Sequence, residues 1–174
     1  MQEDRLLQHI ETIREDVRDE VKRRIQQRDQ YSMQLTVALG AIAVGAYSSN
    51  GTPRLFIIAP LVAIYFTALI LYSYRIHDLL ASYLREEIEP MFKDLTGLPT
   101  EKEWECWYHN AGRKPGIRRW FFAVEMITVT LAALCFLWQR EWSIPGLFHF
   151  VLVWSTFAYP VLVGLTLLLL PKNQ

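Results

Sequence analysis

Few residues in this chain have the types and spacing needed for chemistry. Cys106 and His109 form a Cys-x-x-His pair. That is half of a zinc site, and a structural zinc ion takes four ligands, so we expect no metal there. The remaining histidines, His9, His77 and His149, are scattered. The chain has no phosphate-binding glycine loop, dinucleotide fingerprint, zinc-protease helix or serine elbow. The sequence therefore predicts no cofactor, no metal and no enzymatic activity.

Glu125 is the one acidic residue inside a long apolar stretch. Carboxylates in such a setting are costly and are functional candidates by default. A helix would place Glu125 about 9 Å from Arg119, within reach of a membrane interface. A salt bridge to Arg75, Arg118 or Arg119 is the favoured interpretation, and a proton or cation site is the alternative.

A stripe of small and polar residues is the second candidate. Gln34, Ala38, Ala41 and Gly45 follow one another at helical spacings, and Ser48 comes next. Small faces allow helices to approach closely, so packing within the subunit or against a neighbour is one interpretation. The sharper one is that copies of this helix surround an axis and line a narrow pore, with Gln34 as a polar ring near the inner mouth.

Four apolar stretches must position these residues. They are Met33–Ser49, Leu55–Tyr74, Trp120–Trp138 and Leu147–Leu170. Each is long enough, or nearly so, to cross a hydrocarbon core of about 30 Å as a helix. The predicted fold is an all-α integral membrane protein with four transmembrane helices.

Basic residues predict the orientation. Sixteen of the 18 Lys and Arg residues lie before the first stretch, between the second and third, or at the C-terminus, and only Arg54 and Arg140 lie elsewhere. Basic residues near span ends stay on the cytoplasmic side. We therefore expect a multi-pass protein of the cell inner (plasma) membrane with both termini cytoplasmic. The formal net charge is zero, so no duplex nucleic-acid partner is expected.

The first two spans are expected to extend into the cytoplasm as a helical stalk. Apolar residues recur at spacings of three and four from Leu6 to Ile25, and we expect one rod from Leu6 to about Tyr47. The second helix should run on to Pro90, with an apolar face that covers the first helix. The expected segments are a cytoplasmic amphipathic helix (1–30), a transmembrane hairpin (31–75), a cytoplasmic extension with an aromatic helix (76–119), and a second hairpin with a short tail (120–174).

This layout resembles the small multi-spanning membrane effectors of prokaryotic anti-phage systems, and most of all the channel subunit of the Hailong system. The resembling features are the charged helix Leu6–Gln30, the extension Tyr74–Ile88 and the helix carrying Trp104 and Trp107. The resemblance implies an oligomeric ion channel that stays shut until infection, with the N-terminal helix as its gate. It also implies a nucleotidyltransferase, or its nucleotide product, as a partner.

Lys22, Arg23, Arg24 and Arg28 are the residues that could meet the phosphates of such a ligand, although a solvated basic face is the favoured interpretation. The leading hypothesis is a homo-oligomeric gated ion channel in the lipid bilayer, with four copies as the working number. The alternative is a non-conducting membrane adaptor that recruits a soluble partner through its stalk.

Overall fold

The computed structural model describes residues 2–48, 51–97, 117–141 and 146–169, and every element among them is helical. The elements are α1 (Gln2–Tyr47), the 3₁₀-helix η1 (Pro53–Ile57), α2 (Ala59–Tyr83), the π-helix η2 (Leu84–Ile88), α3 (Glu89–Thr96), α5 (Ile117–Glu141) and α6 (Leu147–Leu169). The all-α prediction is confirmed. The chain divides into two compact units: Met1–Asp29 with Tyr72–Pro115, and Gln30–Leu71 with Gly116–Gln174.

Helix α1 is a single uninterrupted helix of 46 residues. No glycine or proline precedes Gly40, so nothing breaks the backbone hydrogen-bond ladder in its first half. At 1.5 Å per residue it is about 69 Å long. The predicted rod is confirmed, and it begins four residues earlier than expected.

The second helical run does not end at Pro90, which corrects the sequence prediction. A π-turn follows α2 directly, and Pro90 lies in the first turn of α3, where a missing backbone N–H is tolerated. The helix ends at Gly97, whose φ of 67° is left-handed and whose N–H donates to the Lys93 carbonyl at 2.8 Å. Glycine adopts this conformation without steric cost.

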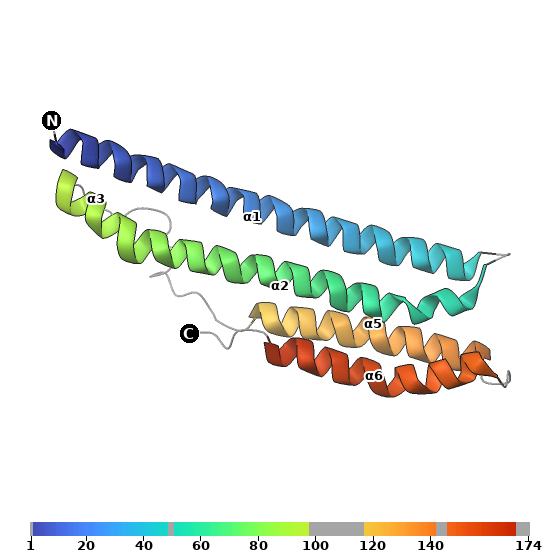
Figure 1. The fold of residues 1–174 in the computed structure, drawn as a ribbon. Coiled ribbons are helices and arrows are strands. Elements are labelled where there is room, and N and C mark those ends of the chain that lie inside the picture. Colours follow the sequence, from blue (N-terminus) through green and yellow to red (C-terminus); the bar gives the residue numbers. More distant parts are fainter. Residues whose placement is uncertain (1, 49–50, 98–116, 142–145, 170–174) are drawn as a thin grey trace. The chain divides into compact units, whose positions relative to one another are not determined.

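The core of the first unit joins the start of α1 to the η2–α3 segment, which lie side by side in Figure 1. Ile10 packs in one cluster with Leu84, Ile88 and Phe92. Partly buried residues of α1, among them Leu7, Ile13 and Val17, lie against the cluster. The mutual covering of two amphipathic extensions therefore occurs as the spacing predicted.

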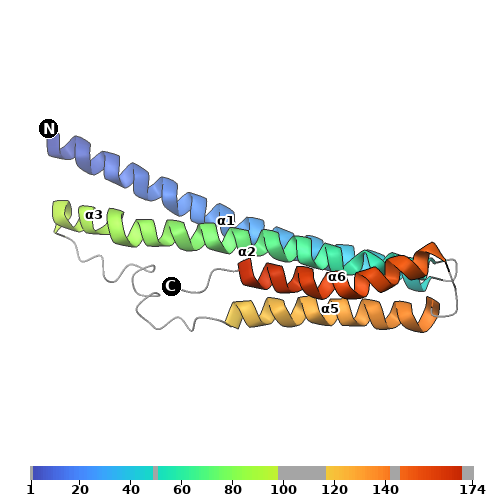
Figure 2. The ribbon, with the colours of Figure 1, turned by 60° about the horizontal axis from the view of Figure 1, so that its bottom comes forward.

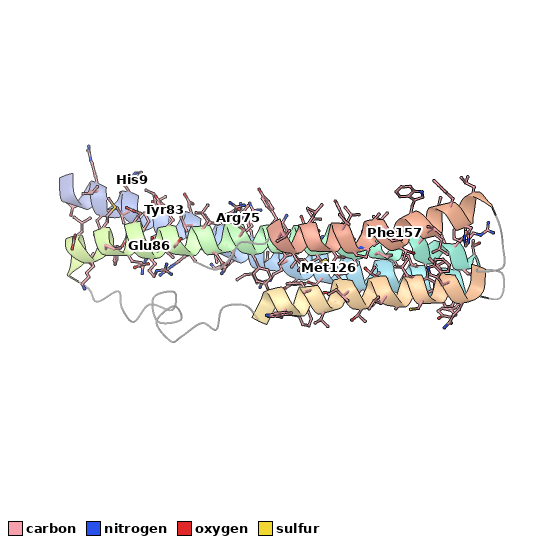
Figure 3. All side chains as sticks on the ribbon, turned by 90° about the horizontal axis from the view of Figure 1, so that it is seen from below. His9, Arg75, Tyr83, Glu86, Met126 and Phe157 are labelled. Carbon is pink, nitrogen blue, oxygen red and sulfur yellow. The ribbon has the colours of Figure 1, made fainter. Side chains whose placement is uncertain are left out.

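The apolar face predicted for the second extension splits in two. Leu84 and Ile88 are buried, whereas Leu79 is 68% exposed and Tyr83 is 43% exposed (Figure 3). Ser73 of α2 is also buried, and its hydroxyl donates to the Arg24 carbonyl of α1 at 3.0 Å. Small polar residues thus occupy part of the contact with α1, and part of the apolar stripe faces outward.

The core of the second unit is formed mainly by α5 and α6, which lie side by side in Figures 1 and 2. Leu134, Leu137, Leu152 and Tyr159 make up its buried cluster. Helix η1 packs against α5, and the Tyr159 hydroxyl donates a hydrogen bond to the Ile57 carbonyl. This bond and the cluster fix η1 to the α5–α6 pair.

The outer face of α6 is apolar and exposed. Met126 of α5 is fully buried, whereas Phe157 of α6 is 69% exposed (Figure 3). Other large apolar side chains exposed on α6 include Leu147, Phe150, Trp154, Val161 and Leu168. A soluble domain does not present such a continuous apolar surface to water, so this face fits contact with lipid.

Three helical stretches are long and apolar enough to cross a membrane: Pro53–Thr96, Trp120–Gln139 and Leu147–Leu168. They support a membrane protein by length and composition. The predicted stretch Met33–Ser49 is not among the three; its residues up to Tyr47 form the C-terminal part of α1 and include Gln34, Thr36 and several small residues. Pro60 is the second residue of α2 and lies at the start of that helix, where proline is tolerated.

Candidate functional site

The small-residue stripe of α1 lies along the border of its packed face. Gln34, Ala41 and Ser48 are exposed, while Ala38 and Gly45 are partly buried. On the adjoining face of the helix Leu35 and Ala46 are buried. Packing within one subunit therefore does not cover the whole stripe, and its exposed residues can contact water, lipid or another copy of the chain.

Gly45 differs from Ala41 in its surroundings. The Gly45 carbonyl accepts a hydrogen bond from the Thr52 N–H at 3.2 Å. A Cβ at position 45 would lie 3.0 Å from Leu55 Cδ1, a close contact with a flexible side chain. A bulky residue at Gly45 would disturb the packing of η1 against α1. Ala41 is therefore the better position for testing what this stripe faces.

Glu125 is partly buried on α5. Among the described side chains of its own unit it has no ion pair or hydrogen bond. The side chains of Arg118 and Arg119, two of the proposed partners, lie outside the described residues. The arrangement leaves both interpretations of Glu125 open as proposals: an interfacial salt bridge or a cation site.

Two of the four basic residues Lys22, Arg23, Arg24 and Arg28 pair with acids on the preceding turn of α1. Lys22 Nζ lies 2.8 Å from Asp19 Oδ1, and the hydrogen bond from Lys22 lowers the pKa of Asp19 below its usual value. Arg24 Nε donates to Glu20 Oε1 at 2.8 Å. Side chains at these spacings lie on the same face of a helix, so each acid is within reach of its basic partner. Part of the positive charge is thus neutralised within the helix.

The other two members are placed differently. Arg23 is largely exposed, with its Nη1 3.7 Å from Glu20 Oε2. The Arg28 guanidinium lies over the Tyr74 ring, 4.4 Å from its centroid. Arg28 therefore contributes a cation–π contact between α1 and α2. Of the four basic side chains, that of Arg23 is the most exposed and thus the most accessible to an anionic partner.

An ion-pair cluster that the sequence analysis missed joins α1 to α3. Glu89 accepts two hydrogen bonds from Arg14, and Arg18 approaches the same carboxylate. The sequence signal was weak because Glu89 is one of three acids within four residues, and only the packing distinguishes it from Glu86 and Glu87.

The described residues contain no group of three or more potential metal ligands. Cys106 and His109, and also the aromatic helix expected around Trp104 and Trp107, lie outside the described residues. The described part of the chain offers helix surfaces and ion pairs.

Comparison of the chain with protein-family models, with curated proteins and with solved structures gives no match.

Proposed function

We propose that this chain is a subunit of a homo-oligomeric, gated ion channel in the plasma membrane. The observation that carries the proposal is the position of the α1 stripe. Gln34, Ala41 and Ser48 are exposed although they lie beside the buried residues Leu35 and Ala46. Polar and small side chains on such a helix are poor lipid contacts and good pore linings, because they leave room for water and offer it hydrogen bonds.

The C-terminal part of α1 acts as the fourth span in this proposal. It is less apolar than the three other stretches, which is expected of a helix that neighbouring copies shield from lipid. Oligomers of identical chains close around a symmetry axis, so one helix per copy is enough to enclose a path. Four copies, with both termini in the cytoplasm, are the proposed arrangement.

The stalk supplies the gate in this proposal. Helix α1 continues without a break from the packed stalk residues to the stripe, so displacement of its first half can be transmitted along a single rigid element. The resemblance to anti-phage effectors supports a defence role, in which a nucleotidyltransferase or its nucleotide product would be the trigger. Arg23 is the first residue to test as its contact.

Conductance of the purified full-length protein in planar bilayers tests the channel. We expect current from the protein after deletion of residues 1–25, because the deletion removes the stalk half of α1. If neither the full-length nor the shortened protein gives current, although both samples contain intact oligomers, a channel gated in this way is excluded. Native mass spectrometry gives the number of copies.

A second function, a non-conducting adaptor, is favoured by a different observation. Leu79, Tyr83, Met91 and Leu95 are exposed apolar residues on α2 and α3 in the first unit. Exposed apolar residues outside a lipid environment are typical of protein-binding surfaces. An adaptor predicts a stoichiometric soluble partner in a mild-detergent pull-down, the loss of that partner in Leu79→Ser, and no current.

A further inference from the structure

Glu89 is a buried acid. It is the first residue of α3, directly after the π-turn, and only 2% of its side chain is exposed. A carboxylate taken out of water must be matched by charged hydrogen-bond donors, because its desolvation is costly. The surroundings of Glu89 therefore indicate what holds this end of the stalk together.

Two arginines of α1 supply the match. Arg14 Nε donates to Glu89 Oε1 at 2.8 Å, and Arg14 Nη2 donates to Oε2 at 3.0 Å. Arg18 Nη2 lies 3.5 Å from Oε1. The paired donors of Arg14 fit the two oxygens of a carboxylate, and such bidentate pairs fix geometry as well as charge.

Arg14 is itself enclosed. Its side chain is 13% exposed, and its guanidinium lies 4.6 Å from the centroid of the Phe92 ring. The charge cluster thus borders the apolar cluster that contains Ile10, Ile88 and Phe92. Because Arg14 and Arg18 are four residues apart, a slide of α1 by one turn would put one arginine about where the other lies. The charge cluster therefore fixes which side of α1 faces Glu89, and the packing of Ile10 in the apolar cluster favours the observed register.

The π-turn orients this acid. A π-turn holds one more residue per turn than an α-helix, and such turns often occur at functional sites. Here the turn spans Leu84–Ile88 and directly precedes Glu89. If this turn relaxed to an α-helix, the residues after it would rotate by about 100°, and Glu89 would leave Arg14. The orientation of the acid thus depends on this local backbone form.

We propose that Arg14, Arg18 and Glu89 form a latch that fixes the N-terminal part of α1 against α3 in the resting protein and separates when the stalk opens. The first half of this proposal concerns packing alone. The second half rests on the proposed channel function. A buried pair is suited to this role because removal of one partner leaves the other charge uncompensated, whereas exposed pairs such as Lys22–Asp19 contribute little.

Hydrogen exchange of the full chain in detergent micelles tests the packing half. We expect the amides of residues 5–18 to exchange at least about tenfold faster in Glu89→Gln than in the parent protein, because Arg14 and Arg18 lose the buried carboxylate that Glu89 supplies. Glu87→Gln is the matched control: it makes the same change two residues earlier at an exposed position, and we expect no change.

A double-mutant cycle separates a direct pair from general destabilisation. Arg14→Gln alone should also accelerate exchange of these amides. The double variant Arg14→Gln/Glu89→Gln should exchange no faster than whichever single variant exchanges faster, because the Arg14–Glu89 charge pair is then removed as a whole. Multiplicative effects of the two substitutions, or unchanged exchange in Glu89→Gln, would overturn the latch.

Ion flux from liposomes tests the gating half. Glu89→Gln should raise flux in the absence of any trigger, and Glu87→Gln should behave like the parent protein. The gating role would be overturned if the exchange rates of the Arg14 and Glu89 variants are coupled, the parent protein conducts ions, and Glu89→Gln nevertheless gives the same flux as the parent protein. Absence of flux from every variant, including the truncation of residues 1–25, would instead refute the channel, while the exchange cycle would still decide whether the latch exists.

Discussion

The strongest quantitative prediction concerns two leucines that lie five residues apart. Leu84 is 1% exposed and packs against Ile10, Ile88 and Phe92, whereas Leu79 is 68% exposed. Substitution of a buried leucine by alanine costs about 2–5 kcal/mol. A pair of helices can partly close around the lost volume, so we expect about 2–3 kcal/mol for Leu84→Ala. At 1.4 kcal/mol per factor of ten, this accelerates local exchange about 30- to 150-fold.

Leu79→Ala is the matched control because it makes the same change in helix propensity on the same run of helix. It removes an exposed side chain, so its effect should stay within about 0.5 kcal/mol, or roughly twofold in exchange. The assay is hydrogen exchange of residues 2–29 in the full-length protein. Equal acceleration by both substitutions would refute the assignment of faces and restore the single apolar stripe that the spacing suggested.

Three further predictions concern other parts of the chain. Ala41→Trp should block liposome flux if its side of α1 faces a pore, whereas Leu61→Trp, at an exposed position of α2, should conduct normally; conduction by both would place the path elsewhere. Gly97→Ala should cost about 1 kcal/mol, measured as faster exchange in the last turn of α3, because its φ is left-handed and a Cβ there meets no atom within 4 Å that could offset the strain. Lys22→Gln should raise the pKa of Asp19 toward 3.8 in a carboxyl NMR titration. Because the hydrogen bond from Lys22 lowers this pKa in the folded protein, the pair stabilises α1 above pH 3.8 and loses that effect as the pH falls through the folded pKa; an unchanged pKa would contradict the pairing.

The helices themselves could be predicted because their causes are local. The uninterrupted α1 follows from the absence of glycine and proline before Gly40. The expected end of the second helix at Pro90 is wrong because proline is tolerated in the first turn of a helical segment, where its missing N–H would have no partner in the helix. Pro90 is the second residue of α3, directly after the π-turn, and the helix continues to Thr96.

The faces and the ion pairs could not be predicted because they depend on packing between distant residues. Leu79 and Leu84 are both compatible with one stripe on an ideal helix, and only the partner helix separates them. Arg14 and Glu89 are 75 residues apart in the sequence, and many other acids and arginines lie at similar separations. Spacing alone predicts the candidate stripe that contains Ala41. The structure shows which of its residues are exposed in one copy of the chain, and the proposal that they line a pore stays a prediction.

The antiparallel packing of the stalk has a consequence for how the protein is made. Ile10 is synthesised 74 residues before its contact Leu84. At translation speeds of about 5–20 residues per second, the N-terminal helix waits roughly 4–15 s with its apolar side uncovered. The packing of the stalk therefore cannot be completed during synthesis of α1 itself, and the apolar side of this helix stays without its native cover until α3 has been made.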